Sequence, residues 1–310
     1  MIDLVRLGRS DVRVSPLGVG VMTWGETTRT YGGTQGRDAE AAALESSLAS
    51  GVNFFDTAEM YGRGASETRF GELSRDRTLV LATKFAPLPG RTVRSLPKAL
   101  DRSLARLNRP AVDLYQIHFH TPWMRIRPLM GRLADVVEAG KTRAVGVSNF
   151  SAKQMRTAHA ALERRGIPLA SNQIQYSLLH REPEVDGILD TCRELNVTLI
   201  AYMPLAMGAL TGKYTVQARP PDRIRRMVGP FRGNGLDAVA PVVDRLREIG
   251  ARHGKTPGQV ALRWLVEQGT VPIPGAKDAK QAAENAGALT FQLSRDEVDA
   301  LSSATQAWRA

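Results

Sequence analysis

The chain has 310 residues, of which 43% are hydrophobic and 24% charged, proportions of an ordinary globular protein that needs no disulfide or metal for stability. Cys192 is the only cysteine, which excludes an intramolecular disulfide and a cysteine-based metal cluster and is typical of a reducing compartment. The net charge is +11. The excess basic side chains either keep the helix surfaces solvated or help to attract a polyanionic ligand. We expect no nucleic-acid partner, because no long basic run or nucleic-acid-binding motif is present.

The first segment, residues 1–13, alternates charged and apolar residues around a turn that begins at Gly8. This pattern predicts a short β-hairpin that precedes the main fold and covers its N-terminal end. The segment has no hydrophobic signal core. The longest apolar run, residues 198–210, is far shorter than the roughly 20 residues that cross a bilayer. We therefore expect a soluble, cytoplasmic protein without a membrane partner.

Eight short apolar runs, rich in Val, Ile and Leu, are distributed along the rest of the chain. They cover residues 16–21, 52–55, 78–83, 112–117, 143–147, 169–174, 197–202 and 270–274. Nearly continuous apolar runs of this kind are typical of parallel strands that are buried on both faces. Each run is therefore predicted to be a strand of one sheet.

The segments between these runs have the spacing of amphipathic helices. The predicted helices cover residues 37–50, 94–107, 127–139, 151–165, 184–195, 238–252, 258–268 and 279–289, and a last helix follows Ser294. Several have end signals. Gly166 ends one helix as a C-cap glycine, Thr256 and Pro257 open another, and Ser294 forms a capping box with Glu297.

Eight strand–helix units predict a closed (β/α)8 TIM barrel that forms a single domain over residues 1–310. The alternative is an open doubly wound sheet, which favours a Gly-x-Gly-x-x-Gly turn after the first strand. Here Gly18 and Gly20 are present, but the third glycine is missing. The barrel is therefore favoured.

One segment, residues 203–236, departs from the alternation. It is long, rich in Arg, Gly and Pro, and has little periodicity. It follows the seventh strand, on the face of the barrel where active sites lie. Because aperiodic loops of this length are uncommon in compact domains unless they are functional or disordered, we expect it to serve the site.

Ionisable side chains end three of the predicted strands. Asp56 follows the second strand, Lys84 ends the third and His118 follows the fourth, while Tyr61 lies one loop turn beyond Asp56. Taken singly, each has a structural alternative, such as a helix cap or a solvated lysine. Because the carboxyl ends of barrel strands meet at one rim, we expect the four side chains to converge there.

Together these residues suit the delivery of a proton. A free tyrosine has a pKa of about 10, too high for an efficient acid–base group near neutrality. We expect the ammonium of Lys84 to lower the pKa of Tyr61, Asp56 to hold Lys84 in place, and His118 to orient the substrate oxygen or relay a proton. This set suits protonation of the oxyanion that forms when a hydride adds to a carbonyl.

The stretches around these residues resemble the aldo-keto reductase superfamily, and the resemblance extends over essentially the whole chain. The matching stretches are residues 53–58 with 61–62, residues 82–84 and residues 113–118. In that family an Asp, a Tyr, a Lys and a His form the catalytic tetrad, which implies these roles for Asp56, Tyr61, Lys84 and His118. The family usually has an aromatic residue and then proline after the histidine. Here His120 and Thr121 intervene, so His120 is a secondary candidate that faces the substrate.

The resemblance implies NADPH as the cofactor. The nicotinamide amide would contact Ser148, Asn149 and Gln173, Tyr202 would stack on the ring, and Lys277 would face the adenosine 2′-phosphate. The other residues implied to bind the cofactor are Thr23, Trp24, Pro204, Leu205, Gly208, Lys213, Gly275, Gln281, Glu284 and Asn285.

The resemblance also implies an oxidoreductase that reduces a small aldehyde or ketone to an alcohol, with Tyr61 as the general acid. The expected substrate pocket contains Trp24, Phe85, His120 and Trp123. It would be formed by loops at residues 24–37, 87–96 with 122–128, and 214–236. Arg125, Arg127 and the arginines of the long segment 203–236 suit either an anionic aldehyde or a plain charged surface.

A second hypothesis is an NADPH-binding regulatory or redox-sensing subunit of the same fold with little turnover, like family members that attach to potassium channels. Those members typically lack the histidine that corresponds to His118, so the complete tetrad favours an enzyme. We expect no metal, because the sequence lacks a carboxylate–histidine ligand cluster. The oligomeric state stays open between a monomer and a simple homo-oligomer.

Overall fold

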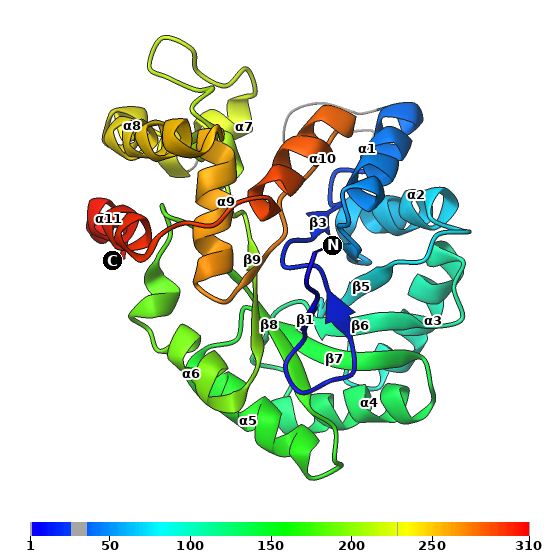
Figure 1. Ribbon diagram of the computed structural model, residues 1–310. Coiled ribbons are helices and arrows are strands. Elements are labelled where there is room, and N and C mark those ends of the chain that lie inside the picture. Colours follow the sequence, from blue (N-terminus) through cyan, green and yellow to red (C-terminus); the bar gives the residue numbers. More distant parts are fainter. Residues whose placement is uncertain (1, 26–35, 228, 310) are drawn as a thin grey trace.

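The computed structural model describes residues 2–25, 36–227 and 229–309 (Figure 1). Eight parallel strands form one sheet in the order of the chain. They are β3 (Val19–Gly20), β4 (Phe54–Asp56), β5 (Val80–Phe85), β6 (Val112–Ile117), β7 (Thr142–Ser148), β8 (Leu169–Gln175), β9 (Thr198–Tyr202) and β10 (Val271–Pro272). The N–H of Gly18 donates to the carbonyl of Pro272 (2.9 Å), and that of Gly20 to Pro274 (3.0 Å). The first and last strands therefore meet, which confirms the predicted (β/α)8 barrel.

Helices surround the barrel (Figure 1). They are α1 (Arg37–Ala49), α2 (Ala65–Leu73), α3 (Ser95–Leu107), α4 (Ile126–Glu138), α5 (Ala152–Glu163), α6 (Ile188–Leu195), α7 (Arg223–Arg226), α8 (Gly235–His253), α9 (Pro257–Glu267), α10 (Ala279–Ala286) and α11 (Arg295–Ala304). The predicted end signals are confirmed at α9 and α11, where Thr256 and Ser294 each form a capping box. In the described part of the chain, no helix has the length and apolar character needed to cross a membrane.

The apolar pattern of the sequence does not predict α2. Its buried face contains Ser66, Glu67 and Gly71 beside a single aromatic residue, Phe70. The carboxylate of Glu67 is buried, and it accepts hydrogen bonds from Thr83 Oγ1 (2.6 Å) and from the guanidinium of an arginine on α3 (2.7 Å). The buried ion pair of Glu67 therefore adds to the packing of Phe70 in holding α2 in place.

The predicted N-terminal hairpin consists of β1 (Val5–Arg6) and β2 (Arg13–Val14), which pair antiparallel. Its residues Leu7, Val12 and Val14 are buried against the inward-facing side chains of the barrel strands. Gly8 has a φ of +53°, and a Cβ there would lie 2.8 Å from the carbonyl oxygen of Ala170. The hairpin thus closes the N-terminal end of the barrel, and its tight turn requires glycine.

The long segment between β9 and α8 is present as expected, but it contains short helical turns: η3 (Ala206–Thr211), α7 and η4 (Gly229–Phe231). Phe231 is buried, and its ring meets that of Tyr214 edge-on at 5.4 Å. Arg225 donates to the hydroxyl of Tyr214 (2.8 Å). The aromatic pair therefore anchors a segment that has no apolar periodicity of its own.

Candidate active site

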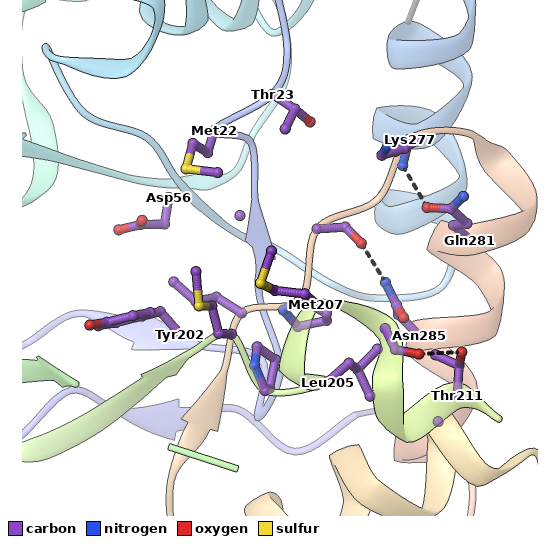
Figure 2. A pocket seen from close by; sticks show the side chains of 18 of the residues that line it. Met22, Thr23, Asp56, Tyr202, Leu205, Met207, Thr211, Lys277, Gln281 and Asn285 are labelled. Atoms are coloured by element: carbon purple, nitrogen blue, oxygen red, sulfur yellow. Dashed lines mark hydrogen bonds between the residues drawn. The ribbon is translucent and has the colours of Figure 1, made fainter. Parts of the chain in front are cut away.

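A cavity of about 730 Å³ lies at the carboxyl ends of the barrel strands, bounded by the segment after β9 and by α9 and α10 (Figure 2). Most of the residues singled out from the sequence line it. They are Thr23, Asp56, Tyr61, His118, Ser148, Asn149, Gln173, Tyr202, Pro204, Leu205, Gly208, Lys213, Gly275, Lys277, Gln281, Glu284 and Asn285. The structure thus gathers these residues, which are far apart in the sequence, around one space.

Lys84, on β5, is fully buried behind the wall of this cavity. Its ammonium donates to Oδ1 of Asp56, to the carbonyl oxygen of Thr57 (2.7 Å) and to Oη of Tyr61 (3.4 Å). An ammonium has three protons, so these three acceptors satisfy it. The fourth expected residue, His118, lies beside them, with its ring edge-on to that of Tyr61 at 5.5 Å. All four members of the expected tetrad are therefore together.

The other oxygen of Asp56, Oδ2, accepts from the side-chain amides of Gln116 (3.1 Å) and Gln173 (2.9 Å). The carboxylate is therefore fixed at both oxygens. Gln173, expected only as a cofactor residue, also orients Asp56. Gln116 is a member of the site that the sequence reasoning missed. Its signal was a glutamine inside an apolar strand, since a buried amide needs a partner.

The electrostatics of Tyr61 differ from the expectation. Burial raises its pKa, Lys84 lowers it and Asp56 raises it, and the net result is a pKa above the usual value. Lys84 thus has the predicted lowering effect on the pKa of Tyr61, but burial, which the prediction did not include, outweighs it. Burial also disfavours the ammonium of Lys84, but Asp56 and Tyr61 outweigh this and raise its pKa. Near neutrality the pair consists of a phenol and an ammonium.

His118 is a neutral imidazole. Burial and then the positive charge of Lys84 lower its pKa to about 3. Its Nδ1 atom is buried and has no hydrogen-bond partner among the described residues. Because His118 lines the cavity, Nε2 is the ring nitrogen that can face it. The residue can therefore exchange a hydrogen bond with a ligand but cannot provide a positive charge.

Four expected cofactor residues form a hydrogen-bonded chain next to His118. Tyr202 Oη donates to Oδ1 of Asn149 (3.0 Å), whose amide nitrogen donates to the carbonyl of His118 (3.1 Å) and to Ser148 Oγ (3.1 Å). Ser148 in turn donates to the carbonyl of Gln173 (2.8 Å). Asn149 has a left-handed backbone, with a φ of +58°. This series of hydrogen bonds fixes polar groups at the cavity wall.

The far end of the cavity is rich in positive charge. Figure 2 shows Lys277 and Gln281 on the opposite side from Asp56 and Tyr202. Burial, and then the charges of Arg225 and Lys213, lower the pKa of Lys277. Lys213, Arg225 and Lys277 are therefore close to one another. Asp222, which forms an ion pair with Arg225 (3.3 Å), and Asp278 offset part of their charge, but the cations prevail, and this favours a bound anion. From the sequence, the arginines of the segment after β9 were expected to suit an anionic substrate or a charged surface, whereas Arg225 lies at this end of the cavity with Lys277.

Two aromatic residues expected at the site lie behind it. Trp24 is fully buried, packs on Phe70 and donates from Nε1 to the carbonyl oxygen of Ala276 (2.8 Å). Phe85 is also fully buried. Neither is on the cavity lining, because the space between barrel and helices takes up large apolar side chains that follow a strand. Both support the site instead of contacting its ligands.

The other two expected substrate residues lie to the side. Nδ1 of His120 is 3.1 Å from the side-chain amide nitrogen of Gln154, and its ring is edge-on to that of Phe150. Trp123 is 56% exposed. Neither is on the cavity lining. Of the expected substrate loop 24–37, residues 26–35 lie outside the described residues.

The chain matches the Aldo/keto reductase family model over residues 16–306. It belongs to this family. The chloroplastic pyridoxal reductase of Arabidopsis thaliana is 38% identical over 301 residues, which cover 92% of this chain and 81% of that protein. The NADP(+) aldo-keto reductase yakc of Schizosaccharomyces pombe is 35% identical over 281 residues, covering 84% of this chain and 81% of that protein.

Solved structures agree with this family membership. The glycerol dehydrogenase of Gluconobacter oxydans matches with a TM-score of 0.84 and 26% identity, covering 98% of this chain and 95% of that chain. A thermostable aldo-keto reductase in complex with the inhibitor epalrestat matches with a TM-score of 0.79 and 28% identity, covering 98% of this chain and 100% of that chain. This aldo/keto reductase is therefore an oxidoreductase with the barrel fold of its family.

Proposed function

We propose that this aldo/keto reductase uses NADPH to reduce an aldehyde or ketone to an alcohol, with Tyr61 as the general acid. The observation that carries the proposal is the position of Tyr61 Oη, 3.4 Å from the buried ammonium of Lys84 on the wall of the large cavity. A phenol beside a fixed cation is suited to losing its proton to a ligand in that cavity.

The residues of the cavity fit a phosphorylated dinucleotide. Lys213, Arg225 and Lys277 suit its phosphates, including a 2′-phosphate, at one end. Ser148 and Asn149 offer polar groups to a carboxamide at the other end. When bound, NADPH supplies a hydride to the carbonyl carbon.

The tetrad residues then provide the proton. The raised pKa of Tyr61 keeps its phenol protonated until the carbonyl oxygen gains negative charge. The phenolate that remains is stabilised by the ammonium of Lys84, which Asp56 holds in place. Neutral His118 donates from Nε2 to the carbonyl oxygen and orients it beside Tyr61.

The described part of the wall suits an uncharged, apolar or aromatic carbonyl. Four methionines that the sequence analysis did not single out line the cavity: Met22, Met60, Met203 and Met207. Thioether side chains are flexible and polarisable, so they adapt to flat ligands of different shapes. Arg125 and Arg127 are exposed and not on the lining, and Arg225, the arginine of the long segment that is on it, lies at the end assigned here to the phosphates. Because one relative is named a pyridoxal reductase, pyridoxal is a suitable first substrate.

The test is to follow NADPH absorbance with pyridoxal and with 4-nitrobenzaldehyde, for the wild-type protein and for Tyr61→Phe. We expect the variant to lose roughly 10²- to 10⁴-fold in kcat, the usual contribution of a general acid, and to keep its affinity for NADPH, measured by fluorescence. Full turnover by Tyr61→Phe would exclude the proposed acid. Tight NADPH binding by the wild type without turnover of any aldehyde would instead indicate a regulatory subunit.

A further inference from the structure

An ion pair with a buried carboxylate and a partly exposed arginine lies next to the tetrad and does not line the cavity. Glu59 precedes Tyr61 by two residues, and its side chain is 5% exposed. Its Oε1 accepts the N–H of Ala86 (2.8 Å) and forms an ion pair with Nη1 of Arg91. The same Nη1 donates to the carbonyl oxygen of Ala86 (3.0 Å). Glu59, Ala86 and Arg91 are therefore connected to one another by hydrogen bonds and an ion pair.

The pair lies where the backbone contacts between β4 and β5 end. Beyond β4, the N–H of Thr57 still donates to the carbonyl of Ala82 at 3.0 Å, but the next contact, from Glu59 N to Lys84 O, has lengthened to 3.5 Å. At the following position the Glu59 carboxylate, a side chain, accepts the N–H of Ala86. The Glu59 side chain thus links the segment that contains Tyr61 to the end of β5, at the point where backbone hydrogen bonds between the two segments end.

Tyr61 lies in an irregular segment, where its N–H donates to the carbonyl of Ala58 (3.1 Å). It begins η1 (Tyr61–Gly64), in which Gly62 and Arg63 both have a left-handed backbone with a φ of 56°. The contact from Lys84 Nζ to Tyr61 Oη, at 3.4 Å, is already at the long end for a hydrogen bond. A shift of the segment by about 1 Å would break it, and displacements of that size cost reactions on the order of 10²-fold.

We propose that Glu59 and Arg91 are positioning residues that hold Tyr61 Oη within hydrogen-bond distance of Lys84. The inference rests on the proposed role of Tyr61 as the general acid. Arg91 is needed because a buried carboxylate without a cation is unfavourable, and its guanidinium also lies over the ring of Phe85, 5.5 Å from the centroid. Arg91 belongs to the connection between β5 and α3, so this connection helps to place the acid.

The test compares Glu59→Gln and Arg91→Leu with the wild type in steady-state aldehyde reduction. The glutamine keeps an acceptor for the N–H of Ala86 but loses the ion pair. We expect kcat to fall by about tenfold or more in both variants, while the KM for the aldehyde and the affinity for NADPH change less than about twofold. Arg91→Lys, which keeps the positive charge, should recover part of kcat.

A matched control is the buried ion pair of Arg181 and Glu184, away from the cavity. The guanidinium of Arg181 also donates to the carbonyl of Ser302 on α11. Glu184→Gln should lose stability but keep kcat. Equal losses of kcat in Glu59→Gln and Glu184→Gln would overturn the inference, as would an unchanged kcat in Glu59→Gln and Arg91→Leu. A Tyr61→Phe variant with full turnover would identify failure of the proposed function separately.

A double variant tests the route of the effect. If Glu59 acts through Tyr61, adding Glu59→Gln to Tyr61→Phe should reduce the single-turnover rate no further, because the group it positions is already gone. If the two substitutions reduce the single-turnover rate independently, so that their effects multiply in the double variant, the inference is overturned. Thermal unfolding of each variant establishes that the measured protein is folded, and Arg91→Lys serves if Arg91→Leu does not fold.

Discussion

The ammonium of Lys84 is a buried charge whose main partner is the carboxylate of Asp56. Lys84→Met would leave that carboxylate buried without a cation, so we expect the free energy of unfolding to fall by roughly 3–5 kcal/mol. Urea unfolding measures this. As a control, Arg77→Met removes the exposed ion pair with Glu45, where we expect a loss below about 1 kcal/mol. Equal losses in the two variants would contradict the argument.

His118 makes stability depend on pH, because it is kept neutral in the folded protein. Its folded pKa of about 3 lies below the value of about 6.5 in an unfolded chain. Between these values the unfolded chain binds a proton that the folded protein does not. The free energy of unfolding should therefore fall as the pH falls from about 6.5 toward 3, by up to about 1.4 kcal/mol per pH unit. In His118→Gln this part of the pH dependence should disappear. If urea unfolding gives the same pH dependence for the variant and the wild type, His118 is not the group responsible.

Among the elements, the segment between β9 and α8 contributes Lys213 and Arg225 to the cation-rich end of the cavity. If this end binds the 2′-phosphate, Arg225→Met should raise the KM for NADPH by roughly tenfold, the effect of losing one charge-assisted hydrogen bond. The KM for NADH should change less than about twofold. Arg219→Met in the same segment is a control, since Arg219 is exposed and off the lining. Equal effects on both cofactors would contradict a 2′-phosphate contact.

The elements also differ in how far the sequence predicts them. The barrel was predictable because its strands are continuous apolar runs and its helices carry amphipathic spacing and end signals, as at Thr256. The helix α2 was not, because Glu67 is buried through an ion pair and apolar periodicity does not detect ion pairs.

The same limit applies to the site. The strand-end position of Lys84 predicts that it approaches Asp56. The expectation that Phe85 lines the substrate pocket is not met, because its side chain is buried in the core. The sign of the pKa shift of Tyr61 depends on desolvation, which is a property of the packed structure and not of residue spacing.

At the scale of the whole molecule, the two ends of the barrel have separate tasks. The hairpin residues Leu7, Val12 and Val14 fill the N-terminal end with apolar contacts. The cavity and the tetrad occupy the carboxyl end. This division is typical of the fold, in which one face provides stability and the other carries the chemistry.

Ligand binding is coupled to the closure of the barrel between its first and last strands. The strands β3 and β10 contain two residues each, whereas β6 contains six. At the junction of β3 and β10, Gly20 on one side and Pro274 and Gly275 on the other line the cavity. A ligand that contacts both sides opposes their separation, by about 2.7 kcal/mol at a concentration of 100 times its Kd.

Amide hydrogen exchange should therefore be faster at Gly18 and Gly20 than in the centre of β6, and NADPH should slow it at the junction in proportion to occupancy. An exchange rate at Gly20 that does not change with NADPH would mean that the barrel closes independently of its ligand. Slower exchange with NADPH would mean that the proposed cofactor also stabilises the junction of β3 and β10.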